Sequence, residues 1–154
     1  MLFKKKKETA TEKKELLYRE NIRVNCEPMD KEQVIRSVGQ LLANSGYVDQ
    51  PYVDAMVERE KTVSTYMGSG LALPHGVEAA KKEVKASGIA VMTFPKGIDW
   101  GGEEVRVVIG IAGVGDEHLD ILATIADKMM DESAADRLAT GDVDTVYRIL
   151  TGKE

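Results

Sequence analysis

The chain has 154 residues, a formal net charge of −5 at pH 7, 43% hydrophobic residues and only 5% aromatic ones. This length predicts one compact domain, residues 16–154. The basic leader before it, residues 1–15, is expected to be flexible. The acidic balance argues against nucleic acid as the main partner, and no uncharged apolar run reaches transmembrane length. The leader's lysines are not followed by the apolar stretch of a secretory signal, so we expect a cytoplasmic protein.

The N-terminal half predicts one strand and two helices. Residues 18–26 are typical of a strand, and residues 29–46 of an amphipathic helix with Asp30 as N-cap, Gln33 completing a capping box and Gly46 ending it. A second helix begins at Pro51, which suits a first helical turn. Its inward-facing residues recur at helical spacing and are Tyr52, Val53, Met56 and Val57. Residues 61–76 mix short extended pieces with glycines, and residues 77–84 could form one or two helical turns.

The C-terminal half predicts two buried strands followed by three helices. Residues 87–94 and 105–113 are rich in Ile and Val, as buried strands are, and the Pro-, Gly- and Asp-containing residues 95–104 between them indicate a loop. Residues 116–132 carry apolar side chains at helical spacing: Leu119, Ile121, Leu122, Ile125 and Met129. Two further helices, residues 132–140 and 142–150, are separated by Gly141 as a C-cap and Asp142 as an N-cap.

Buried strands that alternate with amphipathic helices predict a three-layer α/β domain, with a central mixed β-sheet and helices on both faces. Ligands of such domains usually lie beyond the carboxyl ends of the strands. The chain has two histidines, His75 in LALPHG and His118 in GVGDEHLD, and each follows an apolar extended run. We therefore expect the two histidines to meet at one edge of the sheet.

The surroundings of His75 favour a functional role, although a histidine in a loop is often only a polar surface residue. Pro74 fixes one backbone angle, and Gly76 removes side-chain bulk. Together they are expected to hold the imidazole out of a tight turn with open space around it.

His118 falls in the first turn of a predicted helix for which Asp116 is the candidate N-cap. The positive end of the helix dipole disfavours imidazolium and favours a bound anion, so a neutral His118 could donate an N–H to a phosphoryl group. Two alternatives stay open. His118 could be a plain helix-surface residue, or His75, His118, Asp116 and Glu117 could bind a metal ion, as in a metal-dependent hydrolase.

Arg59 lies near the end of the second predicted helix. A solvated arginine is favoured there by the helix dipole, whereas a role at a phosphate site would use its planar guanidinium. The chain lacks the G-x-x-x-x-G-K-[ST] loop of nucleotide-binding domains, protein-kinase motifs and H-E-x-x-H. If phosphoryl chemistry occurs in this domain, the sequence gives no sign that it binds ATP.

The stretches REKTVSTYMGSGLALPHG and VVIGIAGVGDEH resemble the mannitol-class IIA domain of the bacterial phosphoenolpyruvate-dependent sugar phosphotransferase system. The similarity runs from about Asn21 to Leu150 and implies the same three-layer α/β fold. Such domains accept a phosphoryl group from phospho-HPr and pass it to a IIB domain, which phosphorylates the sugar carried by the membrane component IIC. The resemblance implies that His75 accepts the phosphoryl group, that His118 supports it and that Arg59 stabilises its charge, with no metal or cofactor.

Within this superfamily, Tyr66-Met67-Gly68 and the D-E-H-L run are closer to the mannitol type, whereas Val77 stands where that type often has threonine. A fructose-class or nitrogen-regulatory IIA protein, whose phosphorylation state controls partner proteins, is the alternative. We also expect an apolar rim around His75 that excludes water and receives both partners. The candidates for it are Leu71, Leu73, Val77, Ile98 and Trp100.

Overall fold

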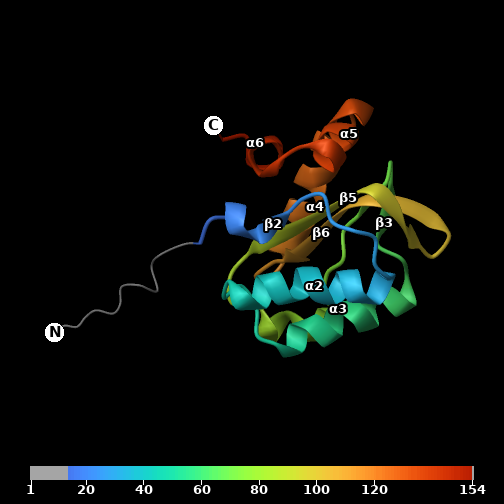
Figure 1. Ribbon diagram of the computed structural model, residues 1–154. Helices are drawn as coiled ribbons and strands as arrows, with labels where there is room; N and C mark the ends of the chain where they lie inside the picture. The colour runs from blue at the N-terminus through green and yellow to red at the C-terminus, as the bar shows by residue number, and fades with distance from the viewer. Residues whose placement is uncertain (1–13, 154) are drawn as a thin grey trace.

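A five-stranded mixed sheet forms the middle layer of the computed structural model, which describes residues 14–153 (Figure 1). The predicted leader thus lies outside the described residues, apart from its last two. In spatial order the strands are β2 (Ile22–Arg23), β5 (Gly88–Trp100), β6 (Glu103–Ala112), β4 (Leu71–Ala72) and β3 (Tyr66–Gly68). β5 and β6 are antiparallel, while β2 runs parallel to β5 and β4 parallel to β6. β3, the last strand in this order, pairs with β4 in the antiparallel direction.

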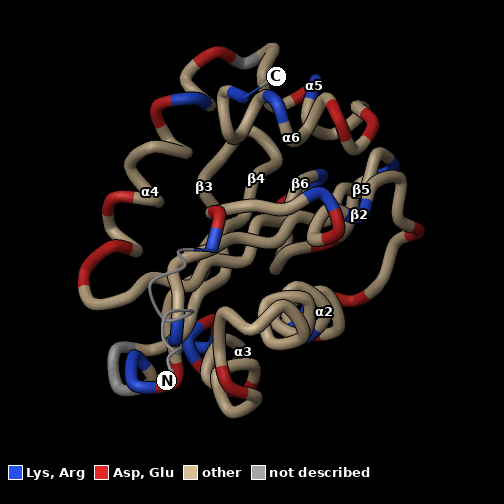
Figure 2. Tube along the Cα trace, turned by 90° about the vertical axis from the view of Figure 1, so that its left-hand side faces the viewer, with Lys and Arg blue, Asp and Glu red and all other residues tan. Residues whose placement is uncertain are grey.

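Helices cover both faces of this sheet, which confirms the predicted three-layer α/β fold. In Figures 1 and 2, α2 (Lys31–Asn44) and α3 (Pro51–Thr62) lie on one face, and α4 (Glu117–Lys128), α5 (Glu132–Thr140) and α6 (Val143–Thr151) lie on the other. Of two short 3₁₀ helices, η1 (Arg19–Asn21) directly precedes β2 and η2 (Glu78–Glu83) lies between β4 and β5. Among the described residues, no helix is both long enough and apolar enough to span a membrane.

The core consists of two apolar clusters, one on each face of the sheet. Along the central strands, Met92 and Val108 pack toward α2 and α3, while Val91 and Ile109 belong to the cluster under α4 to α6. Because both faces are covered, the central parts of these strands, residues 88–92 of β5 and 107–112 of β6, are apolar and show no polar alternation.

The two predicted N-terminal helices are confirmed. Asp30 and Gln33 form the capping box of α2, and Gly46, just beyond its end, has a φ of +83°. Pro51 occupies the first turn of α3. The four residues expected to face inward from α3 are all buried.

The prediction of a loop at residues 95–104 is wrong, because β5 continues through Trp100 and β6 already begins at Glu103. A register shift between Thr93 and Ile98 absorbs the proline and glycine of this stretch. Gly101 and Gly102, with φ of +66° and +100°, form the two-residue turn between the strands. The predicted strand at residues 18–26 is also shorter than expected, because residues 19–21 form η1.

Gly141 is the C-cap residue of α5, as predicted, but its φ of −81° lies outside the left-handed region that a C-cap glycine often adopts. A β-carbon at this position would lie 2.6 Å from the Arg137 carbonyl oxygen, so the glycine is needed for close approach between the end of α5 and the start of α6. The predicted N-cap of α6 is confirmed, because the Asp142 carboxylate accepts a hydrogen bond from the Thr145 N–H at 2.9 Å.

Candidate functional site

His75 and His118 lie together at one edge of the sheet, as expected. The centroids of their rings are 6.1 Å apart, with an angle of 34° between the ring planes. His75 follows β4 and forms a parallel bridge with Ile111 of β6, whereas His118 is the second residue of α4, after the loop that leaves β6. Since β4 and β6 are parallel neighbours, their carboxyl ends meet at this edge, which brings the two histidines together.

The backbone around His75 fixes the orientation and the tautomer of its ring. The Pro74 carbonyl accepts a hydrogen bond from the Ile111 N–H at 2.9 Å, and His75 Nδ1 lies 2.9 Å from the Leu73 carbonyl oxygen. Because a carbonyl can only accept, this contact requires a proton on Nδ1. Nε2 of the neutral ring then carries the free lone pair.

Tyr52 fills the space that the sequence suggested was open beside Gly76. A β-carbon on Gly76 would lie 2.5 Å from Tyr52 Cε1, so the glycine makes room for this ring. The buried Tyr52 hydroxyl accepts a hydrogen bond from the Gly76 N–H at 2.8 Å and donates one to the Ile111 carbonyl at 2.9 Å. Helical spacing predicted that Tyr52 is buried, but no pattern in the sequence connected it with the site.

The loop before α4 is tightly folded. Asp116 was expected to cap this helix, but its side chain makes no capping hydrogen bond. Asp116 occupies the N-cap position with φ −100° and ψ 9°, outside the extended conformation of a capping residue, and its carboxylate pairs with Lys81 at 3.0 Å. Ser87 anchors the same loop, because its hydroxyl accepts a hydrogen bond from the Val114 N–H at 3.0 Å and donates one to Glu117.

The carboxylates considered as metal ligands therefore face other partners. Within residues 14–153, no group of three or more His, Cys, Asp or Glu side chains has an arrangement suited to a metal ion. Asp116 pairs with Lys81 and Glu117 contacts Ser87, so the two histidines are not joined by a carboxylate from this loop.

A small pocket of about 20 Å³ opens between the two histidines. Its lining residues are Tyr52, His75, Gly76, Val77, Lys81, Val84, Gly113 and His118. Lys81 brings a positive charge to the lining that sequence analysis did not anticipate.

The predicted apolar rim is wrong for four of its five members. Only Val77 lines the pocket, while the other four are in the core with at most 5% of their surface exposed: Leu71, Leu73, Ile98 and Trp100. The short β4 is covered by helices on both faces, so its apolar residues point into the core. Three other large apolar side chains near the site residues in sequence are exposed: Val63, Val114 and Leu119.

The pKa of His75 is lowered from the ordinary value of 6.5, mainly because burial disfavours the imidazolium form. Electrostatic interactions with Arg59 and His118 lower it further, while the hydrogen bond to the Leu73 carbonyl and the Glu60 carboxylate act in the opposite direction. The His75 imidazole is therefore neutral at pH 7. Arg59 does not line the pocket, but it lies near enough for its charge to act on His75.

Arg59 lies at the end of α3, in a turn that Glu60 holds in place. The Arg59 guanidinium donates a hydrogen bond to the Val63 carbonyl at 2.7 Å. The Glu60 carboxylate, only 7% exposed, accepts hydrogen bonds from the Thr65 N–H at 2.9 Å and from its hydroxyl at 2.6 Å. It also accepts one from the Trp100 indole N–H at 3.0 Å and pairs with Lys31 at 3.2 Å.

The same turn connects to His75 through the backbone. The Thr65 carbonyl accepts a hydrogen bond from the Leu73 N–H at 3.1 Å, and the Leu73 carbonyl in turn holds His75 Nδ1. Glu60 thus supports both Arg59 and His75. Its position gave one signal in the sequence, because an acidic residue in the last turn of a helix is opposed by the helix dipole and needs other partners.

The sequence family described as the phosphoenolpyruvate-dependent sugar phosphotransferase system, EIIA 2, matches residues 15–153. A mannitol-specific phosphotransferase enzyme IIA component from Halalkalibacterium halodurans is 51% identical over 123 residues, which cover 80% of this chain and 85% of the relative. The solved complex of enzyme IIAMtl and phosphorylated enzyme IIBMtl from Escherichia coli contains a similar chain, with a TM-score of 0.84 and 38% identity, covering 89% of this chain and 98% of that one. The nitrogen-regulatory protein IIA-Ntr from Neisseria meningitidis is 26% identical, with a TM-score of 0.75 and coverage of 88% and 97%.

Proposed function

Because the chain belongs to the EIIA 2 family of the phosphoenolpyruvate-dependent sugar phosphotransferase system, we propose that it is a phosphocarrier for mannitol uptake. It accepts a phosphoryl group from phospho-HPr on His75 and passes it to a IIB domain. The IIB domain then phosphorylates the sugar carried by the membrane component IIC. The observation that carries this proposal is the pair of histidines at one sheet edge, one of them, His75, half-buried and neutral.

His75 Nε2 acts as the nucleophile. Its lone pair forms the new N–P bond while the bond between phosphorus and the donor histidine breaks, and that electron pair returns to the donor ring. The Nδ1 proton stays on His75 throughout, and the Leu73 carbonyl stabilises the positive character that the ring gains. A neutral imidazole is required for this step, which agrees with the lowered pKa of His75.

The surrounding groups stabilise the negative charge of the transferred phosphoryl group. His118 donates a hydrogen bond, and it lies in the first turn of α4, where the positive end of the helix dipole favours an anion. Arg59 contributes positive charge from the end of α3. Transfer between two histidines needs little covalent help, so positioning and charge account for most of the catalysis.

Both partners must reach His75 from the solvent side of the pocket, in the cytoplasm. Val63, Val114 and Leu119 are exposed apolar residues that adjoin the turn of Arg59, the loop before α4 and His118 itself. They replace the buried residues expected from the sequence as candidates for the docking surface of HPr and IIB. Apolar side chains there would exclude water from a phosphoryl group that hydrolysis would otherwise consume.

The mannitol class is favoured over the nitrogen-regulatory class by sequence identity. The mannitol-specific relative is 51% identical, against 26% for the nitrogen-regulatory protein, and both cover most of the chain. A regulatory protein would become phosphorylated in the same way but would deliver nothing to a sugar. Sugar delivery is therefore the measurement that separates these two functions.

The proposal is tested by incubating the purified protein with radiolabelled phosphoenolpyruvate, enzyme I and HPr. We expect acid-labile, base-stable label on the wild type, none on His75→Ala, and transfer slowed by about 100-fold in His118→Ala. Undiminished label on His75→Ala would overturn the assignment of the acceptor. With mannitol-specific IIB and IIC added, label should move to mannitol, and label that moves only to fructose, or to no sugar, would overturn the substrate class.

A further inference from the structure

Tyr52 uses its single hydroxyl to connect the two segments that carry the histidines. A buried phenol needs hydrogen-bond partners, and this one has both a donor and an acceptor within reach. The donor is the N–H of Gly76, directly after His75, and the acceptor is the carbonyl of Ile111, the bridge partner of His75 on β6. From Ile111 the chain continues through the loop to His118.

Tyr52 also lies on the helix that carries Arg59. The two residues are seven positions apart on α3, which corresponds to two helical turns and places them on the same side of the helix. A shift of α3 along its axis would therefore move Arg59 relative to both histidines unless the helix were fixed to them. The Tyr52 hydroxyl provides that connection at the start of the helix.

The contacts of the ring and those of the hydroxyl can be separated. The ring packs where Gly76 lacks a β-carbon, and Tyr52 is only 4% exposed. Phenylalanine would keep this packing and remove only the two hydrogen bonds. Burial raises the pKa of Tyr52, so the hydroxyl remains protonated and able to donate.

We propose that Tyr52 is a positioning residue for phosphoryl transfer, whose hydroxyl holds His75, His118 and Arg59 in their reactive arrangement. This inference rests on the proposed function. The Tyr52 hydroxyl is engaged by the Gly76 N–H and the Ile111 carbonyl, so it acts through this backbone and not on the phosphoryl group itself. Loss of the hydroxyl should therefore slow the chemical step without weakening the binding of the donor protein.

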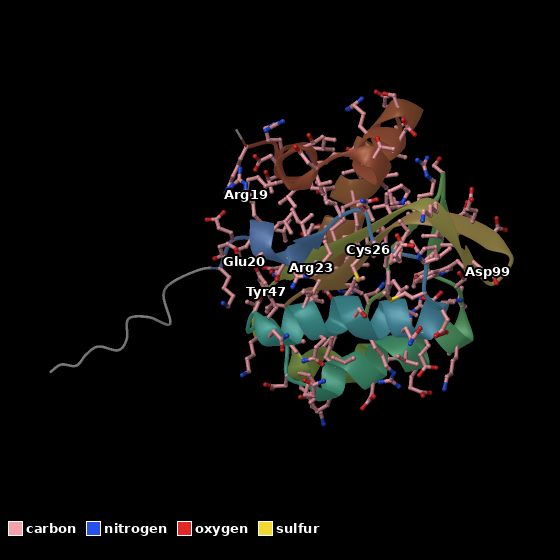
Figure 3. The ribbon with its side chains drawn as sticks, in the orientation of Figure 1. Arg19, Glu20, Arg23, Cys26, Tyr47 and Asp99 are labelled. Atoms are coloured by element: carbon pink, nitrogen blue, oxygen red, sulfur yellow. The ribbon has the colours of Figure 1, made fainter. Side chains whose placement is uncertain are left out.

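The chain offers a matched control in Tyr47. Its ring packs against Gly88, where a β-carbon would lie 2.2 Å from Tyr47 Cε1, and its hydroxyl donates to the Glu15 carbonyl. The construction is the same, a buried tyrosine on a glycine with a backbone partner, but the hydroxyl's partner belongs to neither histidine segment. Figure 3 labels Tyr47 near the end of α2.

The test compares Tyr52→Phe with Tyr47→Phe in rapid-mixing transfer from phospho-HPr, at temperatures where both variants are folded by circular dichroism. For Tyr52→Phe we expect the maximal transfer rate to fall by about 10- to 100-fold, with the phospho-HPr concentration at half-maximal rate unchanged. Tyr47→Phe should transfer at the wild-type rate. By NMR, the Gly76 amide proton should exchange faster in Tyr52→Phe and at the wild-type rate in Tyr47→Phe.

A folded Tyr52→Phe protein that transfers at the wild-type rate would overturn the inference. An equal loss of rate in both variants would overturn it as well, because the effect would then be one of general stability. A Gly76 amide that stays protected in Tyr52→Phe would contradict the connection itself. If the wild type takes up no label, the proposed function fails, and this inference fails with it, whereas a labelled wild type beside an unimpaired Tyr52→Phe contradicts the inference alone.

Discussion

At the scale of single residues, His75 has two properties that a phosphoryl acceptor needs at neutral pH. Burial and the electrostatic interactions with Arg59 and His118 keep the ring neutral, and the Leu73 carbonyl holds the proton on Nδ1. Because the pKa of His75 lies below 6.5, the neutral form should persist at pH values where an exposed histidine is already half protonated. Phosphoryl acceptance should therefore decline only at pH values below 6.5, the ordinary pKa of histidine.

The contribution of Arg59 to this pKa can be measured directly. Arg59→Gln removes the cation but keeps a side chain that can donate to the Val63 carbonyl, so we expect the pKa of His75 to rise toward its ordinary value. Titration of the His75 ring by NMR measures the change. Arg148→Ala, an exposed arginine on α6, serves as the control and should leave the titration unaltered. A His75 pKa that is unchanged or lower in Arg59→Gln would contradict this account.

The sequence pointed to His75, His118 and Arg59 but not to Tyr52 and Glu60, and the reason is chemical. His75, His118 and Arg59 belong to short motifs, so their types and spacing point to them directly. Tyr52 and Glu60 become part of the site only through contacts with distant residues. The Tyr52 hydroxyl reaches a backbone atom 59 residues away, and Glu60 reaches an indole 40 residues away. No local pattern contains that information.

At the scale of secondary-structure elements, Glu60 joins the end of α3 to β5. One carboxylate oxygen accepts from both the Thr65 N–H and the Trp100 indole, while the other accepts from the Thr65 hydroxyl. An amide at this position has only one oxygen, so at least one of these partners would lose its acceptor. The turn that carries Arg59 depends on this carboxylate.

Glu60→Gln should therefore lower the free energy of unfolding by about 1–3 kcal/mol, because a buried donor is left without its charged partner. Trp100 is the only tryptophan, so its indole N–H gives one unambiguous NMR signal, and this signal should move upfield as the hydrogen bond weakens. Urea unfolding measures the stability. Glu58→Gln is the matched control, since Glu58 is exposed on the same helix and pairs with Lys61. An indole signal that does not move in Glu60→Gln would contradict the role given to this carboxylate.

The prediction of elements succeeded where the periodicity was long and failed where glycine and proline interrupted a strand. Helices α2 and α3 and the helices after β6 were located from their apolar spacing. Residues 95–104 contain Pro95, Gly97 and a glycine pair, which in isolation indicate a loop. In the folded protein the pairing with β6 continues around them through a shift in register. The pairing of residues 98–100 with residues 103–105 across the turn decides this, and the turn preferences of the single residues do not show it.

At the scale of the whole molecule, the alternation of buried strands and amphipathic helices was sufficient to predict three layers. The spatial order of the strands was not predictable. β4 has two residues and β3 has three, so neither carries a pattern of its own, and their places come from pairing with β6 and with each other. The edge of the sheet where the two histidines meet is set by this order.

The shortness of β4 affects the order in which parts of the protein unfold. β5 and β6 form a long hairpin closed by a two-residue turn, and their central residues are buried on both faces, so this pairing belongs to the best-protected part of the sheet. The segment that carries His75 has only a two-residue strand, held from the side by β6 and by the turn after α3. Under rising urea we expect this segment to open first, so that phosphoryl acceptance is lost before the circular dichroism of the sheet changes. Simultaneous loss of both signals would mean that the His75 segment and the hairpin unfold as one cooperative unit.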